Sequence, residues 1–104
     1  MVLNKDNFKQ EVEDRASLVL VDFFAVWCGP CQIMSPIIQE LSNEYKDKPI
    51  KIGKLNIDEN QDIAVKYNVM SIPTFIFFKD GKVVAQKIGY CDKDELKEMI
   101  DNNL

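Results

Sequence analysis

The chain of 104 residues contains no histidine, only three cysteines and only four glycines. Without histidine it lacks the most common metal ligand among the side chains, and the one whose unperturbed pKa lies closest to neutrality. The four glycines are too widely spaced to form the G-x-G-x-x-G motif that binds dinucleotides, and there is no phosphate-binding loop. The sequence therefore predicts no cofactor: no nicotinamide or flavin site of a recognisable kind lies in this chain.

Charge and hydrophobicity exclude two further classes of protein. The formal net charge is -4 and no basic run is present, so the sequence does not predict contact with the phosphate backbone of nucleic acid. The longest apolar run, from Leu18 to Trp27, is interrupted by Asp22 and is about half the roughly 20 residues needed to span a bilayer. We therefore expect no nucleic acid and no membrane segment, and partners that are proteins or small molecules.

The length and the hydrophobic share of 46% suit a single domain over residues 1–104. The first six residues become polar at once and lack the apolar segment of about 7–15 residues that a secretory signal requires, so we expect a cytoplasmic location. In that reducing compartment, three cysteines are too few for a scaffold held by disulfides. The close pair, Cys28 and Cys31, is therefore expected to be catalytic or metal-binding.

Turn signals divide the chain into short alternating segments. Helical periodicity predicts a first helix capped by Asn4 and ending near Asp14, a second from Pro30 to Tyr45 with a kink at Pro36, a short one around 63–67, and a last one after Asp92. Strands are predicted at 18–24, 50–57, 74–78 and 83–88, the last two joined by a tight turn at Asp80-Gly81. Strands joined through helices run parallel, whereas the hairpin is antiparallel. The prediction is an α/β fold: one mixed sheet with helices on both faces.

The two cysteines are separated by two residues at the point where a strand ends and a helix begins. This position brings the sulfur of Cys28 near unsatisfied backbone N–H groups and the positive end of the helix dipole, both of which favour the thiolate. Cys31 lies one helical turn further on, where it is expected to be less accessible. Cys28 should therefore attack a disulfide in another molecule, and Cys31 should then attack Cys28. Gly29 allows close approach of a backbone, and Pro30 rigidifies the loop.

Two other interpretations of the pair were weighed. The pair could be half of a zinc site. Structural zinc takes four ligands, so the other two would have to be Cys91 and a carboxylate, or come from a second subunit. An inert structural disulfide is disfavoured, because closing so small a ring constrains little of the unfolded chain. A reversible redox centre is the preferred hypothesis.

Asp22 is a carboxylic acid in the middle of a strand that is otherwise apolar. It could be a hydrogen-bonded core group or a member of a buried ion pair. However, its strand leads directly to Cys28, and desolvation raises the pKa of a carboxyl group. An acid that titrates near neutrality can take or return a proton when Cys31 acts as nucleophile.

Several motifs together resemble the thioredoxin family, and the resemblance covers essentially the whole chain. The central motif is Trp-Cys-Gly-Pro-Cys at residues 27–31, with an acid six residues before the first cysteine and Ile-Pro-Thr downstream at 72–74. The other matching pieces are Asp22-Phe23-Phe24-Ala25, Pro36, Lys54-Leu55-Asn56-Ile57-Asp58, Asp80-Gly81 and Gly89. This set is far more specific than an isolated C-x-x-C.

The resemblance implies the thioredoxin fold, a central mixed five-stranded sheet flanked by four α-helices, and reduction of disulfides in protein substrates. It implies that Asp22 lies buried behind the disulfide near Lys54 as a proton relay, and that Pro73 is cis and faces the cysteines. The implied substrate surface consists of Trp27, Gly29, Pro30, Ile72, Pro73 and Gly89. It also implies a monomer that a flavoprotein thioredoxin reductase returns to the dithiol state.

The sequence departs from the family pattern near Trp27 and at Cys91, and other functions compete with the one that the resemblance implies. Phe24 stands where many relatives have tryptophan, and Val26 stands where a charged or polar residue is common, so the rim near Trp27 is more apolar and partner preference is open. Cys91 is an extra thiol, either a small packing residue or one that forms a regulatory adduct or a disulfide-linked dimer. The competing functions are a redox-independent binding subunit of a larger complex, and a disulfide oxidant or isomerase.

Overall fold

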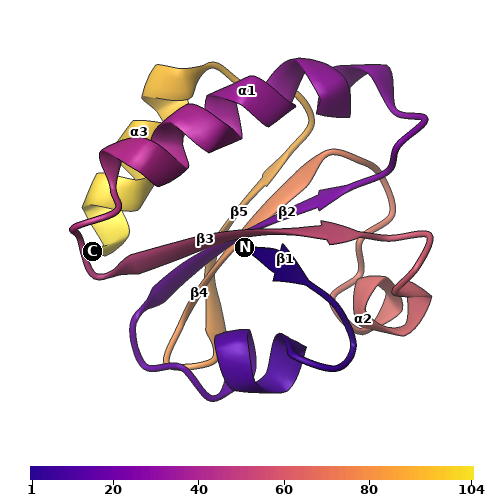
Figure 1. Ribbon diagram of the computed structural model, residues 1–104, viewed down its shortest axis with the longest axis horizontal. Coiled ribbons are helices and arrows are strands. Elements are labelled where there is room, and N and C mark those ends of the chain that lie inside the picture. Colours follow the sequence, from indigo (N-terminus) through magenta and orange to yellow (C-terminus); the bar gives the residue numbers. More distant parts are fainter.

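The computed structural model describes residues 1–104 and consists of a central sheet with helical segments on both sides (Figure 1). The elements follow in the order β1 (Val2–Leu3), η1 (Lys9–Glu13), β2 (Leu18–Phe24), α1 (Gly29–Glu44), β3 (Ile50–Asn56), α2 (Gln61–Lys66), β4 (Thr74–Lys79), β5 (Lys82–Ile88) and α3 (Lys93–Asn103). None of the helices combines the length and the apolar composition that crossing a membrane would need.

The five strands are ordered β1-β3-β2-β4-β5. β3 pairs in parallel with β1 and β2, whereas β4 pairs antiparallel with β2 and β5. The mixed five-stranded sheet and the four helical segments expected from the resemblance are thus confirmed. β1 has only two residues, too few for a periodic pattern, so the periodicity alone indicated four strands.

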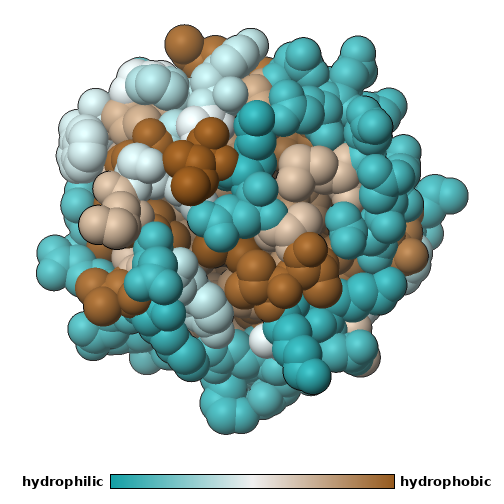
Figure 2. Space-filling view, turned by 180° about the vertical axis from the view of Figure 1, so that it is seen from behind, coloured by the Kyte–Doolittle hydropathy of each residue, from teal (hydrophilic) through white to brown (hydrophobic).

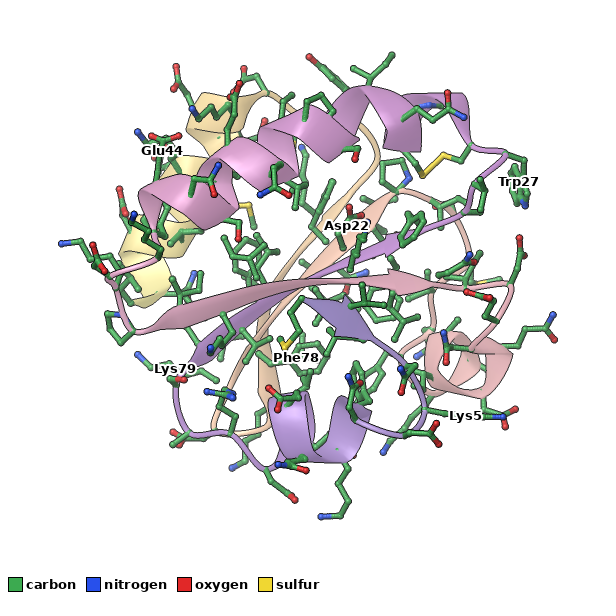
Figure 3. All side chains as sticks on the ribbon, viewed as in Figure 1. Lys5, Asp22, Trp27, Glu44, Phe78 and Lys79 are labelled. Carbon is green, nitrogen blue, oxygen red and sulfur yellow. A yellow bond between two sulfur atoms is a disulfide. The ribbon has the colours of Figure 1, made fainter.

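The residues of β2 face two separate cores because successive side chains of a strand point to opposite sides. Leu18 and Leu20 pack with α1 and α3, while Val19, Val21 and Phe23 pack against η1 and the α2 region. This burial on both faces explains why the strand reads as a continuous apolar run. By the same alternation, Asp22 shares the face of Leu20 and lies beneath α1, as Figure 3 shows.

The first helical segment differs from the prediction. The side chain of Asn4 does accept hydrogen bonds from the backbone N–H groups of Asp6 and Asn7, at 2.8 and 3.1 Å. The turn that it caps leads into a short π-helix, in which the N–H of Asp14 donates to the carbonyl of Lys9 at 2.7 Å. The periodicity identified the buried residue Val12 correctly, but it could not distinguish a wide turn from an α-helix.

β2 has the predicted bounds, and the other boundaries agree with the predicted ones or differ by one or two residues. β3 ends at Asn56 instead of 57, and α2 begins at Gln61 instead of 63. α1 continues through Pro36 to Glu44, so the proline does not end the helix. Asp92 caps α3 as predicted, accepting a hydrogen bond from the N–H of Glu95 at 2.8 Å.

Gly81 provides a test of how the β4–β5 turn packs against η1. Its φ is +74°, and a Cβ at this position would collide with the carbonyl oxygen of Glu13. We predict that Gly81→Ala lowers the free energy of unfolding by about 2 kcal/mol or more, measured by urea denaturation followed by circular dichroism. Asp80→Gly is the control, since Asp80 also has a positive φ and a glycine accepts it easily. A loss below about 0.5 kcal/mol for Gly81→Ala would show that Gly81 and the carbonyl of Glu13 are not in tight contact.

Candidate active site

Cys28 and Cys31 form a disulfide at the N-terminal end of α1, with their Cα atoms 5.2 Å apart. Cys28 is the N-cap residue of this helix, and its sulfur accepts a hydrogen bond from the backbone N–H of Cys31 at 3.1 Å. A donor at this position would also stabilise a thiolate on Cys28 once the disulfide is opened. The predicted placement of the first cysteine at a helix N-terminus is therefore confirmed.

The predicted difference in accessibility between the two cysteines is wrong for this disulfide state. Each cysteine is only 5% exposed. The two form a small cluster with Ala25, and Ile57 and Ile72 pack against it. Since the bonded sulfurs also cover each other, exposure does not distinguish the two cysteines in this state.

The loop before Cys28 is held by two hydrogen bonds that the sequence did not predict. The indole N–H of Trp27 donates to Oδ2 of Asp58 at 2.8 Å, although the ring itself is 70% exposed. The side-chain amide of Gln32 donates to the carbonyl of Val26 at 2.9 Å. Asp58 is 31 residues away along the chain, and no sequence pattern joins it to Trp27. Together these bonds hold the loop that precedes Cys28. Figure 3 shows Trp27 at the outer end of this loop, beside the disulfide.

One further segment packs against the cysteines, and another is hydrogen-bonded to that segment. The Ile72–Pro73 peptide bond is cis, as the resemblance implied, and Ile72 packs against the cysteine cluster. The N–H of Gly89 donates to the carbonyl of Pro73 at 2.8 Å, which brings the end of β5 to the same edge. Gly29 has no neighbouring atom within 4 Å of where a Cβ would lie, so space beside the disulfide is open.

Asp22 lies beneath α1 with only 5% of its surface exposed. Its Oδ1 atom has no hydrogen-bond partner. Burial raises the pKa of this carboxyl to about 7, because the loss of hydration disfavours the anion; the positive charge of Lys54 opposes the shift. The proton of Asp22 is therefore exchangeable close to neutral pH.

Asp22 lines a cavity of about 70 Å³ between α1 and β3, and several of the other lining residues are polar. Ser35, Gln39 and Ser42 line it from α1, and Lys54 lines it from β3. A space of this volume with several polar groups can admit water. Water in such a cavity could exchange protons with Asp22 without passing through the disulfide.

Lys54 is the exact register partner of Asp22, on the neighbouring strand β3. Even so, the two residues form no ion pair, and Lys54 is exposed with its Nζ atom 5.9 Å from the ring centroid of Phe24. The structure thus brings Lys54 near Asp22 as the resemblance implied. Its influence on the carboxyl is a charge effect at a distance and not a direct bond.

Cys91 is not part of this site. It is buried in the core between the sheet and α3, together with Leu96 and Ile100. Burial raises the pKa of its thiol to about 11, which disfavours the reactive thiolate. The structure thus favours the packing role over the regulatory one. No group of three or more His, Cys, Asp or Glu side chains is placed to hold a metal ion, so the ligand set of the zinc interpretation is not assembled.

Comparisons with known proteins agree with this geometry. The family model described as Thioredoxin matches residues 1–102. A protein named Thioredoxin from Buchnera aphidicola subsp. Acyrthosiphon pisum is 47% identical over 102 residues, which cover 98% of this chain and 94% of that protein. Proteins of the same name are similar too: one from Pseudomonas aeruginosa is 46% identical over 94% of this chain and 90% of its own length, and one from Bacillus subtilis is 47% identical over 88% of each.

The buried carboxyl of Asp22 predicts an unusual dependence of stability on pH. Between about pH 4 and pH 7 the folded protein holds a proton that the unfolded chain has released, so stability falls as the pH rises and levels off above about 7. We predict that Asp22→Asn removes this slope and raises the free energy of unfolding at pH 8 by up to about 4 kcal/mol, with little gain at pH 4. Urea denaturation across this pH range measures the effect, with the exposed Asp47→Asn as control. A gain that is equal at both pH values would contradict the assignment.

Proposed function

Because this chain belongs to the thioredoxin family and is a thiol-disulfide oxidoreductase that reduces disulfides in protein substrates, we propose that Cys28 is its attacking thiol and Cys31 its resolving thiol. The observation that supports this assignment most directly is the position of Cys28 at the start of α1, where the N–H of Cys31 donates to its sulfur. That donor and the helix dipole favour a thiolate on Cys28 and not on Cys31.

The proposed cycle moves two electrons. The Cys28 thiolate attacks one sulfur of the substrate disulfide, a mixed disulfide forms, and the departing substrate thiolate takes up a proton. Cys31 then loses its proton and attacks the sulfur of Cys28, which breaks the mixed disulfide and releases the second substrate thiolate, and this also takes up a proton. The protein ends as the Cys28–Cys31 disulfide and the substrate as a dithiol.

We assign the deprotonation of Cys31 to Asp22. A base whose pKa lies near the working pH is partly ionised and still able to accept a proton. Asp22 faces α1, the helix that carries Cys31, and its cavity offers a path by which the proton can leave. Lys54 assists by keeping the carboxyl pKa from rising further.

We propose that substrates dock on the surface formed by Trp27, Gly29, Pro30, Ile72, Pro73 and Gly89. Trp27 supplies exposed aromatic area, and the open space beside Gly29 admits a second backbone. Gly89 has a φ of +86°, which glycine adopts without strain, and it has no side chain that would obstruct a docking segment.

Family membership implies disulfide-containing protein substrates and a reductase partner. We propose further that this reductase is a flavoprotein, that the chain acts as a monomer of one domain over residues 1–104, and that it works in the cytoplasm. A reducing compartment suits the free thiol of Cys91 and a cycle that must regenerate the dithiol. The comparisons do not favour a redox-independent subunit or a disulfide oxidant.

The proposed roles of the cysteines predict different defects for two variants. Cys28→Ser should abolish the protein's acceleration of insulin reduction by dithiothreitol, because no attacking thiolate remains. Cys31→Ser should also lose turnover but accumulate a mixed disulfide at Cys28, visible by mass spectrometry. Accumulation of the adduct at Cys31 in Cys28→Ser, with no adduct at Cys28 in Cys31→Ser, would reverse the two roles. Coupling the same assay to candidate reductases identifies the electron donor.

The proposed base predicts a defect that depends on pH. Asp22→Asn should slow the release of substrate from the mixed disulfide by about tenfold or more at pH 7, and much less above pH 9, where the Cys31 thiol ionises unaided. Single-turnover oxidation of the reduced protein by a peptide disulfide measures the rate, with Asp47→Asn as control. An equal loss at every pH would show that Asp22 has a structural role only.

A further inference from the structure

The surface around the disulfide is built from three chain segments that carry no charge. No charged residue occurs in residues 23–39, 67–78 or 88–91, although 29% of all residues are charged. The segments include the β2–α1 loop, the start of β4 after Pro73 and the end of β5, which lie at one edge of the molecule. In Figure 2, the corner that corresponds to this edge, at the upper left, is mainly pale or brown, and strongly hydrophilic residues gather elsewhere.

Two large side chains beyond the proposed docking residues stand out on this edge. Met70 is 94% exposed, and it lies two residues from Ile72, within about 7 Å along the chain. Tyr90 is 56% exposed and follows Gly89, whose N–H is bonded to Pro73. Both therefore adjoin the Ile72–Pro73 segment, which packs against the cysteines, and their exposure shows that neither packs the core.

The charged residues that bound these segments are already engaged within the chain. Lys66 pairs with Glu13 at 2.7 Å, and Lys87 pairs with Glu95 at 2.7 Å. Asp92 caps α3. Asp58, beside Trp27, forms no ion pair, although it accepts the indole N–H. An acidic side chain of a partner that docks here would therefore lose hydration and find no free cation at these borders.

We propose that Met70 and Tyr90 are specificity-determining residues, which select protein segments whose disulfide cysteine is flanked by large uncharged apolar residues. This inference rests on the proposed function and specifies its substrate class. Met70 is flexible and polarisable, so it can adapt to apolar side chains of different shape. Tyr90 offers a rigid aromatic face beside Gly89. Both favour apolar neighbours of the disulfide, and the lack of a free cation disfavours acidic ones.

Three disulfide peptides of equal length test the proposal, with leucine and phenylalanine, with glutamate, or with lysine beside the cysteines. The rate constant for reduction of each by the dithiol protein is measured chromatographically and divided by its rate constant with dithiothreitol, which corrects for intrinsic reactivity. We expect the wild type to prefer the apolar peptide about tenfold over the glutamate peptide, and by a smaller factor over the lysine peptide, which can pair with Asp58. Met70→Lys should reduce the preference over the glutamate peptide at least about fivefold, and Tyr90→Ser should reduce both preferences.

Val83→Lys is the matched control. Val83 is 48% exposed but pairs with Phe78 near the far end of the hairpin, whereas Ile88 pairs with Thr74 beside the site. If Met70→Lys and Tyr90→Ser behave like this control, or if the wild type reduces all three peptides equally, the inference is overturned while the proposed function stands. If the wild type reduces none of them, the proposed function itself fails. A dimer in sedimentation equilibrium that Met70→Lys dissociates would assign this surface to a second copy and also overturn the inference.

Discussion

The burial of β2 on both faces is the constraint on which the rest of the structure depends. Its neighbours β3 and β4 hold it in the middle of the sheet, while α1 covers one face and η1 with α2 covers the other. This leaves a single strand that is rigid along its length and ends directly before the cysteine loop. The position of Cys28 at the start of α1 follows from where that strand stops.

The same burial creates the chemistry of Asp22. On an exposed strand this carboxyl would be hydrated and ionised well below neutral pH. Beneath α1 it loses water, gains no direct partner and keeps its proton up to about pH 7. The buried carboxyl makes the protein less stable at neutral pH, and the same burial gives Asp22 the raised pKa on which its proposed role as a base depends. The cavity beside Asp22 is large enough to admit water.

Sequence patterns predicted those parts of the molecule that depend on local periodicity. The continuous apolar run identified β2, three- and four-residue spacing identified α1, and Asp80-Gly81 identified the hairpin turn. The pattern failed where the signal was short or ambiguous: the two residues of β1 carry no period, and the π-helical turn at η1 has the same apolar residues as an α-helix. The expected difference in accessibility between Cys28 and Cys31 was wrong, because their burial depends on residues such as Ile72 that are distant in the chain.

By itself, the sequence determined that this is an α/β protein with a redox-capable cysteine pair at a helix start, because strand period, helix period and cysteine spacing are local properties. Tertiary structure alone decided which groups meet there. It brought Asp58 to Trp27, placed Lys54 beside Asp22 without an ion pair, and buried Cys91 away from the site. Such contacts join segments tens of residues apart, and only the packing of helices on a sheet specifies them. Hydration, which sets the pKa of Asp22 and the exposure of Met70, is likewise a property of the packed molecule.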